Sequence, residues 1–271
     1  MPYFVTEDNC NLYYDLRGKG KAVVMIHGGG CNRNHFKKQL VYLRERYQVL
    51  SYDLRGHGDS DRTEYGLTLP QCAKDLKELV EFCELKDVVL VGWSMGTSII
   101  FEYIRQFGCQ NISKLCLIDM TPKFVTDREW RLGLNGSYEV DSLLNDVSAM
   151  AADWDRMVDG VVPALFSKVG YEGEKENFDF AYSASKNNTP HVMINMWVAM
   201  GVKDYRKELK NITVPTLITY GGKSKLYPPE VSKYMNEQIQ DSILMEFEEC
   251  GHSLHMEEPE RFNNALDNFI G

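Results

Sequence analysis

The residues best suited to chemistry are a serine and the glycines on either side of it. Gly92-Trp93-Ser94-Met95-Gly96 has the form G-x-S-x-G. The motif directly follows the apolar run 88–91, which is typical of a buried strand, and precedes a helical pattern over residues 97–106. In that setting the serine lies on a tight strand-to-helix turn, with the helix N-terminus directed at the site. We therefore expect Ser94 to be a nucleophile. The alternative is a solvated serine in a glycine-rich turn.

A serine hydroxyl needs a neighbouring base to attack at neutral pH, and histidine commonly supplies it. His252 is the best placed of the six histidines, because it follows the last apolar strand pattern and precedes the amphipathic pattern 259–270. A loop at a strand end can bring its imidazole over Ser94. We expect His255 to be a packing or capping residue and His27 to hold the loop that follows it. The other three are expected to be surface or satisfied polar residues: His35, His57 and His191.

A glycine-rich loop at another strand end could supply hydrogen-bond donors. A tetrahedral oxyanion requires two convergent N–H groups. The Met95 N–H, directly after the serine, is one candidate. The other comes from the loop His27-Gly28-Gly29-Gly30 after the apolar run 23–26, with Gly29 as the first choice and Gly30 as the second. The alternative for this loop is plain flexibility.

Short apolar runs alternate with helical patterns along the chain, and these elements must position the candidate residues. An edge hairpin is expected over residues 3–5 and 12–14, and helices over 70–84, 97–106 and 259–270. Near-continuous apolar runs are typical of parallel strands that are covered on both faces. The alternation therefore predicts an α/β fold with a mostly parallel sheet. The expected core strands are residues 23–26, 47–52, 88–91, 115–118, 216–220 and 243–247.

The alternation breaks between residues 121 and 210, where the chain is helical and rich in Met, Trp and Tyr. We interpret residues 121–210 as a helical cap over the strand ends, with the core formed by 1–120 and 211–271. In this cap an apolar stripe packs onto the core or forms an adaptable pocket wall. Trp93 could line the same pocket or anchor the turn. The stripe is Met193, Met196, Trp197 and Met200, and the candidate substrate-binding residues are Gly30, Trp93, Met196 and Trp197.

The composition excludes several function classes. The 271 residues carry 30 basic and 39 acidic side chains, a net charge of −9, which disfavours nucleic acid and anionic membranes as partners. The longest uncharged run near the middle of the chain, 88–101, is too short to span a bilayer, and the N-terminus lacks a secretory-signal pattern. Seven scattered cysteines without a CxxC pair favour a cytoplasmic protein without a zinc cluster.

Taken together, the motifs resemble those of the α/β-hydrolase fold superfamily, in its haloperoxidase-like and carboxylesterase-like branch. The resemblance implies an eight-stranded, mostly parallel sheet whose second strand is antiparallel, with helices on both faces and a helical cap inserted after strand six. It also implies a Ser–His–acid triad and no cofactor. The matching segments, in family order, are the loop 27–30, Asp53-Leu54-Arg55-Gly56-His57-Gly58-Asp59-Ser60, the serine motif, Val214-Pro215-Thr216-Leu217, and Gly251-His252 with Glu257, Pro259 and Phe262.

One departure from the family pattern concerns the acid. The branch usually places it as G-x-x-D after the strand that here ends near residue 220, but this chain has Ser224 at that position. A neutral hydroxyl cannot stabilise an imidazolium as a carboxylate does. Asp119, at the end of the run 115–118, is the expected substitute, because both strand ends lie on the same side of the nucleophile strand. A cap carboxylate is the alternative role for Asp119. Glu248 and Glu249 are weaker candidates for the acid.

The sequence thus favours hydrolysis of a small or medium, largely apolar carboxylic ester through an acyl-enzyme. Lactone, thioester or amide hydrolysis, carbon–carbon bond hydrolysis of diketones, and perhydrolysis would use the same residues. A serine at position 94 disfavours dehalogenation and epoxide hydrolysis, which require a carboxylate nucleophile. A hydrolase-fold binding protein without turnover is the non-catalytic alternative, and Ser224 is its support.

Overall fold

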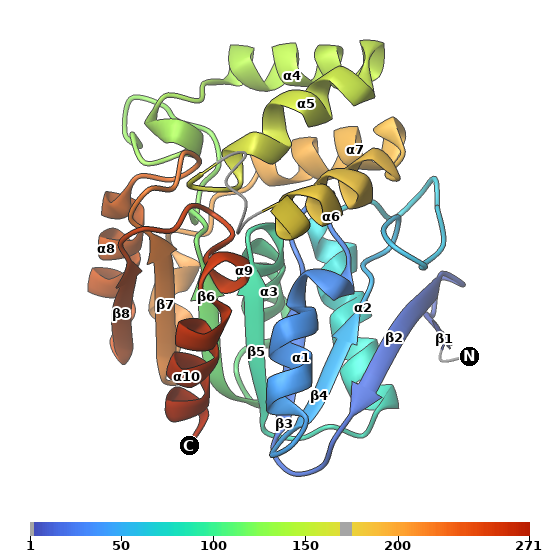
Figure 1. Cartoon of the computed structure of the whole chain (residues 1–271), viewed down its shortest axis with the longest axis vertical. Coiled ribbons are helices and arrows are strands. Elements are labelled where there is room, and N and C mark those ends of the chain that lie inside the picture. Colours follow the sequence, from blue (N-terminus) through green and yellow to red (C-terminus); the bar gives the residue numbers. More distant parts are fainter. Residues whose placement is uncertain (1–2, 169–174) are drawn as a thin grey trace.

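A single eight-stranded sheet forms the centre of the molecule (Figure 1). The computed structural model describes residues 3–168 and 175–271. The strand order is β1-β2-β4-β3-β5-β6-β7-β8; β1 pairs with β2 and β2 with β4 in antiparallel fashion, and the remaining pairs are parallel. The predicted fold class is therefore confirmed. The strands are β1 Tyr3–Val5, β2 Asn11–Arg17, β3 Ala22–Ile26, β4 Gln48–Tyr52, β5 Val88–Trp93, β6 Ile112–Ile118, β7 Thr216–Gly221 and β8 Ser242–Phe247.

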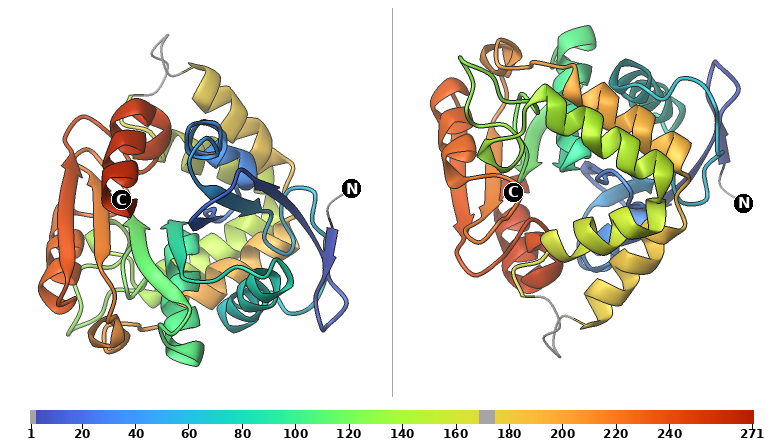
Figure 2. Two further views of the ribbon diagram at one scale, coloured as in Figure 1. Left: turned by 90° about the horizontal axis from the view of Figure 1, so that it is seen from below. Right: turned by 90° about the horizontal axis from the view of Figure 1, so that it is seen from above.

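Helices cover both faces of the sheet, which is why its central strands are apolar on both sides. Val24 and Leu90 point to the face covered by α2 and α3, whereas Val23 and Val89 point to the face covered by α1 and α10. Figure 2 shows the sheet edge-on between these two helical layers. The helices of the two layers are α1 Lys37–Leu43, α2 Leu69–Phe82, α3 Met95–Phe107, α8 Pro229–Gln238 and α10 Pro259–Ile270, with the short α9 Leu254–Glu257 leading into α10.

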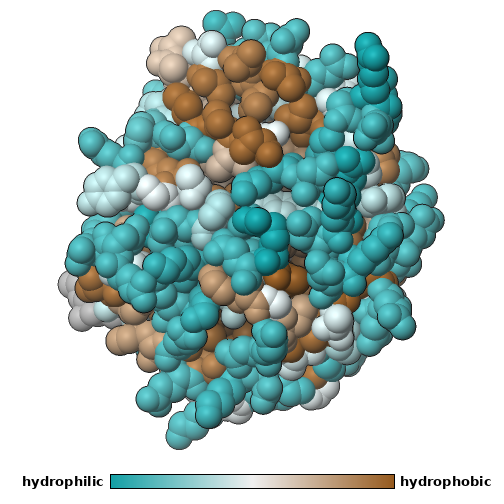
Figure 3. Space-filling model, turned by 180° about the vertical axis from the view of Figure 1, so that it is seen from behind, coloured by the Kyte–Doolittle hydropathy of each residue, from teal (hydrophilic) through white to brown (hydrophobic). Residues whose placement is uncertain are grey.

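Among the described residues, four α-helices lie between β6 and β7 in the chain and beyond the carboxyl ends of the strands (Figures 1 and 2). Buried side chains of α4 and α7 join the main core cluster, while α5 and α6 form a smaller cluster with Met256 of α9. Figure 3 shows apolar surface at this end of the molecule, where α4, α7 and the residue after α7 expose Val140, Leu144, Val198 and Val202. The four helices are α4 Val140–Ala152, α5 Trp154–Ala164, α6 Lys175–Lys186 and α7 Pro190–Gly201.

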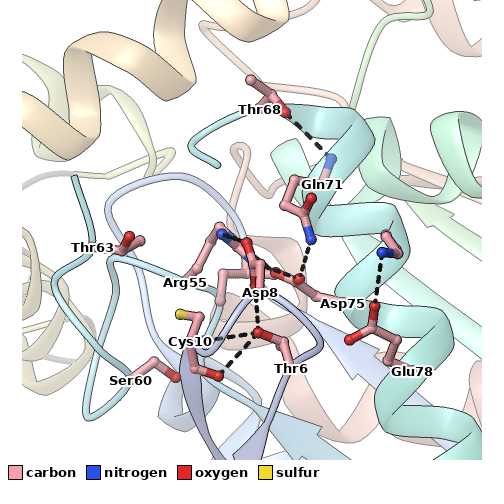
Figure 4. A network of polar contacts seen from close by, with 12 residues as sticks. Thr6, Asp8, Cys10, Arg55, Ser60, Thr63, Thr68, Gln71, Asp75 and Glu78 are labelled. Atoms are coloured by element: carbon pink, nitrogen blue, oxygen red, sulfur yellow. Dashed lines mark hydrogen bonds and ion pairs between the residues drawn. The ribbon is translucent and has the colours of Figure 1, made fainter. Parts of the chain in front are cut away.

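A buried arginine ties the N-terminal hairpin to the loop that follows β4 (Figure 4). The Arg55 side chain is fully buried and donates to both carboxylate oxygens of Asp75 in α2, at 2.6 Å each. It also donates to both oxygens of Asp8 in the hairpin turn, at 2.9 and 3.0 Å. Bidentate pairing of this kind restricts the orientation of the side chains in addition to pairing their charges. The segment that carries His57 toward the candidate site is thereby held in place.

No helix within residues 3–168 or 175–271 is long and apolar enough to cross a membrane.

Candidate active site

Ser94 lies at a sharp turn between β5 and α3. Its backbone has φ 54° and ψ −124°, a conformation that costs a non-glycine residue energy and occurs at functional sites. The Ser94 N–H donates to the carbonyl of Ile118 at 3.0 Å, which fixes the turn against β6. The sequence placed the helix start at residue 97, but α3 begins directly at Met95 because Ser94 is its N-cap. Gly96 is required here, since a Cβ at this position would lie 2.1 Å from the carbonyl oxygen of Ile26.

His252 and Asp119 meet in a buried hydrogen bond, although 132 residues separate them in the chain. His252 Nδ1 lies 2.7 Å from Asp119 Oδ2, and each side chain is only 1% exposed. Trp93 restrains the loop that carries His252, because its indole N–H donates to the His252 carbonyl at 2.9 Å. The ring of Tyr227 packs against the imidazole, with the ring centroids 5.7 Å apart. The histidine is therefore fixed by backbone, packing and carboxylate together.

The tautomer of His252 follows from this arrangement. An ionised carboxylate only accepts hydrogen bonds, so Nδ1 carries the proton and Nε2 keeps a free lone pair. No hydrogen bond joins Ser94 Oγ to His252 among the described residues. Catalytic hydrogen bonds of this kind are often long in the absence of substrate and tighten when it binds. The arrangement can act as a base toward a hydroxyl that approaches Nε2.

The two loop glycines that the sequence left as alternatives differ in their hydrogen bonds. The Gly30 N–H donates to His57 Nε2 at 3.2 Å, so this N–H already has an acceptor. His57 Nδ1 in turn donates to the Arg55 carbonyl at 3.0 Å, and burial lowers the pKa of His57 to about 4. Within the described chain, no hydrogen bond uses the N–H of Gly29 or of Met95. These two N–H groups remain available as donors beside Ser94.

The other histidines have structural surroundings. His27 Nδ1 lies 2.8 Å from the Gly28 carbonyl, and its Nε2 accepts from the Leu54 N–H at 3.0 Å, so the ring links the loops after β3 and β4. Burial lowers the pKa of His27 well below its usual value. His255 is fully buried against Phe36 and Trp93, as expected for a packing residue. Of the remaining three, His35 and His57 are buried and His191 is exposed.

A cavity of about 490 Å³ opens above the serine. Ser94 and Gly29 line it together with apolar residues of the chain between β6 and β7 and of the loop after β7, and Asp146 and Arg156 are its charged lining residues. The Trp197 indole N–H donates to the Tyr138 hydroxyl at 2.8 Å, and that hydroxyl donates to Asp146 at 2.6 Å. The apolar lining residues are Phe124, Leu134, Met157, Val161, Ala164, Leu165, Trp197, Met200 and Leu226.

Three residues that the sequence predicts at the substrate do not line the cavity as described. Met196 is fully buried in the main core cluster, so the stripe on α7 divides: Trp197 and Met200 line the cavity and Met196 packs inward. Trp93 is 1% exposed and lies in the core cluster beneath α10. Gly30 does not line the cavity; its carbonyl accepts from Asn188 at 2.8 Å. These positions correct the expected pocket.

Sequence reasoning missed several residues of this site. Gly28 packs directly on Ser94, since a Cβ there would lie 3.0 Å from Ser94 Cβ; the run of three glycines was the available signal. Tyr138 and Tyr227 had no local signal, because each reaches the site from a loop. The sequence predicts for Ser224 only that it lacks the charge of the usual acid. In the structure its Oγ lies 2.7 Å from Asp119 Oδ2. Within the described residues, no cluster of His, Cys, Asp and Glu could hold a metal ion.

The comparison with known families agrees with this geometry. A family model described as the alpha/beta hydrolase fold matches residues 21–259. The chain belongs to the α/β-hydrolase fold family. Within this family it falls in the haloperoxidase and esterase branch. Its eight-stranded sheet with an antiparallel β2 and its strand-to-helix serine turn are features that the resemblance implied.

Three relatives are similar over nearly their whole length. A solved structure of an esterase from Exiguobacterium antarcticum superposes with a TM-score of 0.92 at 30% identity, covering 99% of this chain and 98% of that one. A non-heme chloroperoxidase from Kitasatospora aureofaciens is 26% identical, covering 100% of this chain and 99% of the relative. A pimeloyl-[acyl-carrier protein] methyl ester esterase from Vibrio cholerae serotype O1 is 25% identical, covering 95% and 97%.

Proposed function

We propose that this hydrolase-family protein is a serine hydrolase of carboxylic esters. Ser94 is the nucleophile, His252 the general base and Asp119 the acid that orients it. The observation that carries the proposal is the buried 2.7 Å contact between His252 Nδ1 and Asp119 Oδ2, close to a serine held at φ 54°. A carboxylate in that position fixes the imidazole tautomer and stabilises the imidazolium that forms during reaction. The proposal also accounts for the family pattern despite the serine at position 224.

The proposed reaction runs in two halves. Ser94 Oγ attacks the ester carbonyl carbon while His252 Nε2 takes its proton, and the carbonyl oxygen becomes an oxyanion held by the Met95 and Gly29 N–H groups. The tetrahedral intermediate collapses, the imidazolium gives its proton to the alkoxide leaving group, and an acyl-enzyme remains. Water then attacks this acyl group with His252 again as base. The products are a carboxylic acid, an alcohol and the regenerated serine.

The lining of the cavity favours a small or medium ester with apolar character. Its walls are mainly aromatic and aliphatic, and its volume of about 490 Å³ is in the range of small-molecule sites. We propose that residues 121–210 act as a cap that roofs this site and that 1–120 and 211–271 form the core. The curated relatives include an enzyme named as a methyl ester esterase, which supports an ester substrate.

Turnover is better supported than binding alone. The case for a non-catalytic binding protein rested on the missing carboxylate at Ser224. A carboxylate reaches His252 from Asp119 instead, so that case loses its basis. Lactones, thioesters and amides stay open as substrates, because the same groups would act on their carbonyl carbons.

A panel of p-nitrophenyl and alkyl esters of increasing acyl length tests the proposal. Wild type should hydrolyse short to medium acyl chains, and Ser94→Ala should lose the activity. Ser98→Ala is the matched control, because Ser98 is buried on the same helix one turn further along. Equal hydrolysis by wild type and Ser94→Ala would overturn the proposal.

A further inference from the structure

The serine at the usual acid position is in contact with the acid that replaces it. Ser224 Oγ lies 2.7 Å from Asp119 Oδ2, and this is the same carboxylate oxygen that His252 Nδ1 contacts at 2.7 Å. Position 224 follows β7 and residue 119 follows β6, and these strands are neighbours in the sheet. The hydroxyl therefore approaches the carboxylate from the adjacent strand end.

The direction of this hydrogen bond is fixed by its surroundings. The backbone N–H groups of Leu226 and Tyr227 both point at Ser224 Oγ, each at 3.4 Å. Backbone N–H groups only donate and an ionised carboxylate only accepts. The hydroxyl must therefore accept from the loop and donate its own proton to Asp119. A chain of donors thus runs from the 224–227 loop to the carboxylate.

The backbone holds both ends of this contact. The Asp119 N–H donates to the Thr219 carbonyl at 2.9 Å, which ties the acid to β7. The Lys223 N–H donates to the Cys250 carbonyl at 2.9 Å, so the turn before Ser224 is tied to the loop that carries His252. Relative movement of the acid, the serine turn and the histidine loop is restrained at each of these points.

We propose that Ser224 is a positioning residue for the catalytic acid: its hydroxyl holds the Asp119 carboxylate in line with His252. This inference rests on the proposed function of Ser94, His252 and Asp119. In this chain a carboxylate after β6 and a hydroxyl after β7 together replace the single carboxylate that the family usually has after β7. Because Asp119 is almost fully buried, few other donors can replace the Ser224 hydroxyl.

A positioning role makes a distinct kinetic prediction. Ser224 does not line the cavity, so its loss should leave substrate binding intact and act on the chemical step. Hydrogen bonds to charged groups are strong, so Ser224→Ala should lower kcat by about 10-fold or more with KM within about 2-fold. Ser224→Thr keeps the hydroxyl and should recover most of the activity. In an Asp119→Asn background, Ser224→Ala should cause no further loss, because the two residues act through one hydrogen-bond chain.

The experiment measures kcat and KM for ester hydrolysis by these variants, with thermal unfolding to show that each is folded. Ser242→Ala is the matched control, since its hydroxyl donates to the Ile239 carbonyl at 2.8 Å and lies on β8 away from the site. The expected result is a fall in kcat for Ser224→Ala, recovery in Ser224→Thr and no change in Ser242→Ala.

Three results would overturn the inference. One is a Ser224→Ala enzyme with the kcat of wild type, and another is a loss that appears only in KM. The third is an additive loss in the double variant with Asp119→Asn, which would make Ser224 a structural residue. If wild type and Ser94→Ala are equally active or equally inactive, the proposed function itself fails and this inference fails with it. The two failures are therefore distinguishable.

Discussion

Substituting alanine for Gly28 should separate activity from stability. A Cβ at residue 28 would lie 3.0 Å from Ser94 Cβ, 3.5 Å from Ser94 Oγ and 3.4 Å from Trp93 Cε3. Trp93 is fully buried and hydrogen-bonded to the His252 carbonyl, so it cannot retreat easily. The Ser94 side chain must then move by a few tenths of an ångström. A misplacement of 1 Å can cost about 100-fold, so we expect roughly a 10-fold fall in kcat.

Stability should change much less in this variant. Gly28 does not have a positive φ, so alanine can adopt its backbone conformation. Alanine also reduces the conformational entropy of the unfolded chain, which offsets the crowding by about 0.4–1 kcal/mol. Gly29→Ala is the matched comparison, because its Cβ would meet Met95 and Met193 at ordinary distances of 3.6 to 3.9 Å.

The assay is ester hydrolysis at saturating substrate, with thermal unfolding of both variants. We expect Gly28→Ala to lose clearly more kcat than Gly29→Ala, while both keep the unfolding temperature of wild type within a few degrees. A folded Gly28→Ala enzyme with wild-type kcat would refute the idea that the loop packs against the reacting hydroxyl.

Four further predictions concern other contacts of the structure. Burial lowers the pKa of His35 and of His57 to about 4. Each should therefore contribute about 3 kcal/mol of stability that is present above about pH 6.5 and lost as the pH falls toward 4. Denaturant unfolding between pH 7 and pH 4 measures this loss. Arg55→Ala leaves a buried carboxylate without its partner and should cost about 3–5 kcal/mol in urea unfolding; a loss below about 1 kcal/mol would contradict the buried network. Trp197→Phe removes the donor to the cavity-wall tyrosine and should change the preferred acyl length across the ester panel more than it changes stability. Ser224→Asp places a second carboxylate beside the acid, so hydrolysis at pH 7 should fall, and a gain in activity would contradict the assignment of the acid to β6.

The sheet could be predicted from the sequence because its central strands are buried on both faces. β3 and β5 are buried at every residue, so each is a continuous apolar run bounded by loop residues. The serine turn could be predicted for a similar reason, since a tight strand-to-helix turn demands glycines at fixed positions. The position of Asp119 beside the serine turn could be predicted too, because Asp119 directly follows β6, which is next to β5 in the sheet. These features depend on local pattern and strand adjacency.

The lining of the cavity could not be predicted in this way. Helix α7 is apolar on most of its sides, so its periodicity did not show that Met196 faces the core and Trp197 the cavity. The choice between Gly29 and Gly30 depends on His57, whose ring arrives from the loop after β4. The role of Ser224 depends on a contact with a residue 105 positions away in the chain. Such contacts are set by tertiary packing and leave no periodic signal.

The most direct test of the central claim is covalent labelling by a fluorophosphonate, followed by intact-mass measurement over time. Wild type should gain one adduct rapidly, with the label on Ser94, and Ser94→Ala should gain none. Asp119→Asn should label up to about 10⁴-fold more slowly, because its histidine would lack the orienting carboxylate. Equal labelling of Ser94→Ala and wild type, or of Asp119→Asn and wild type, would contradict the proposed triad.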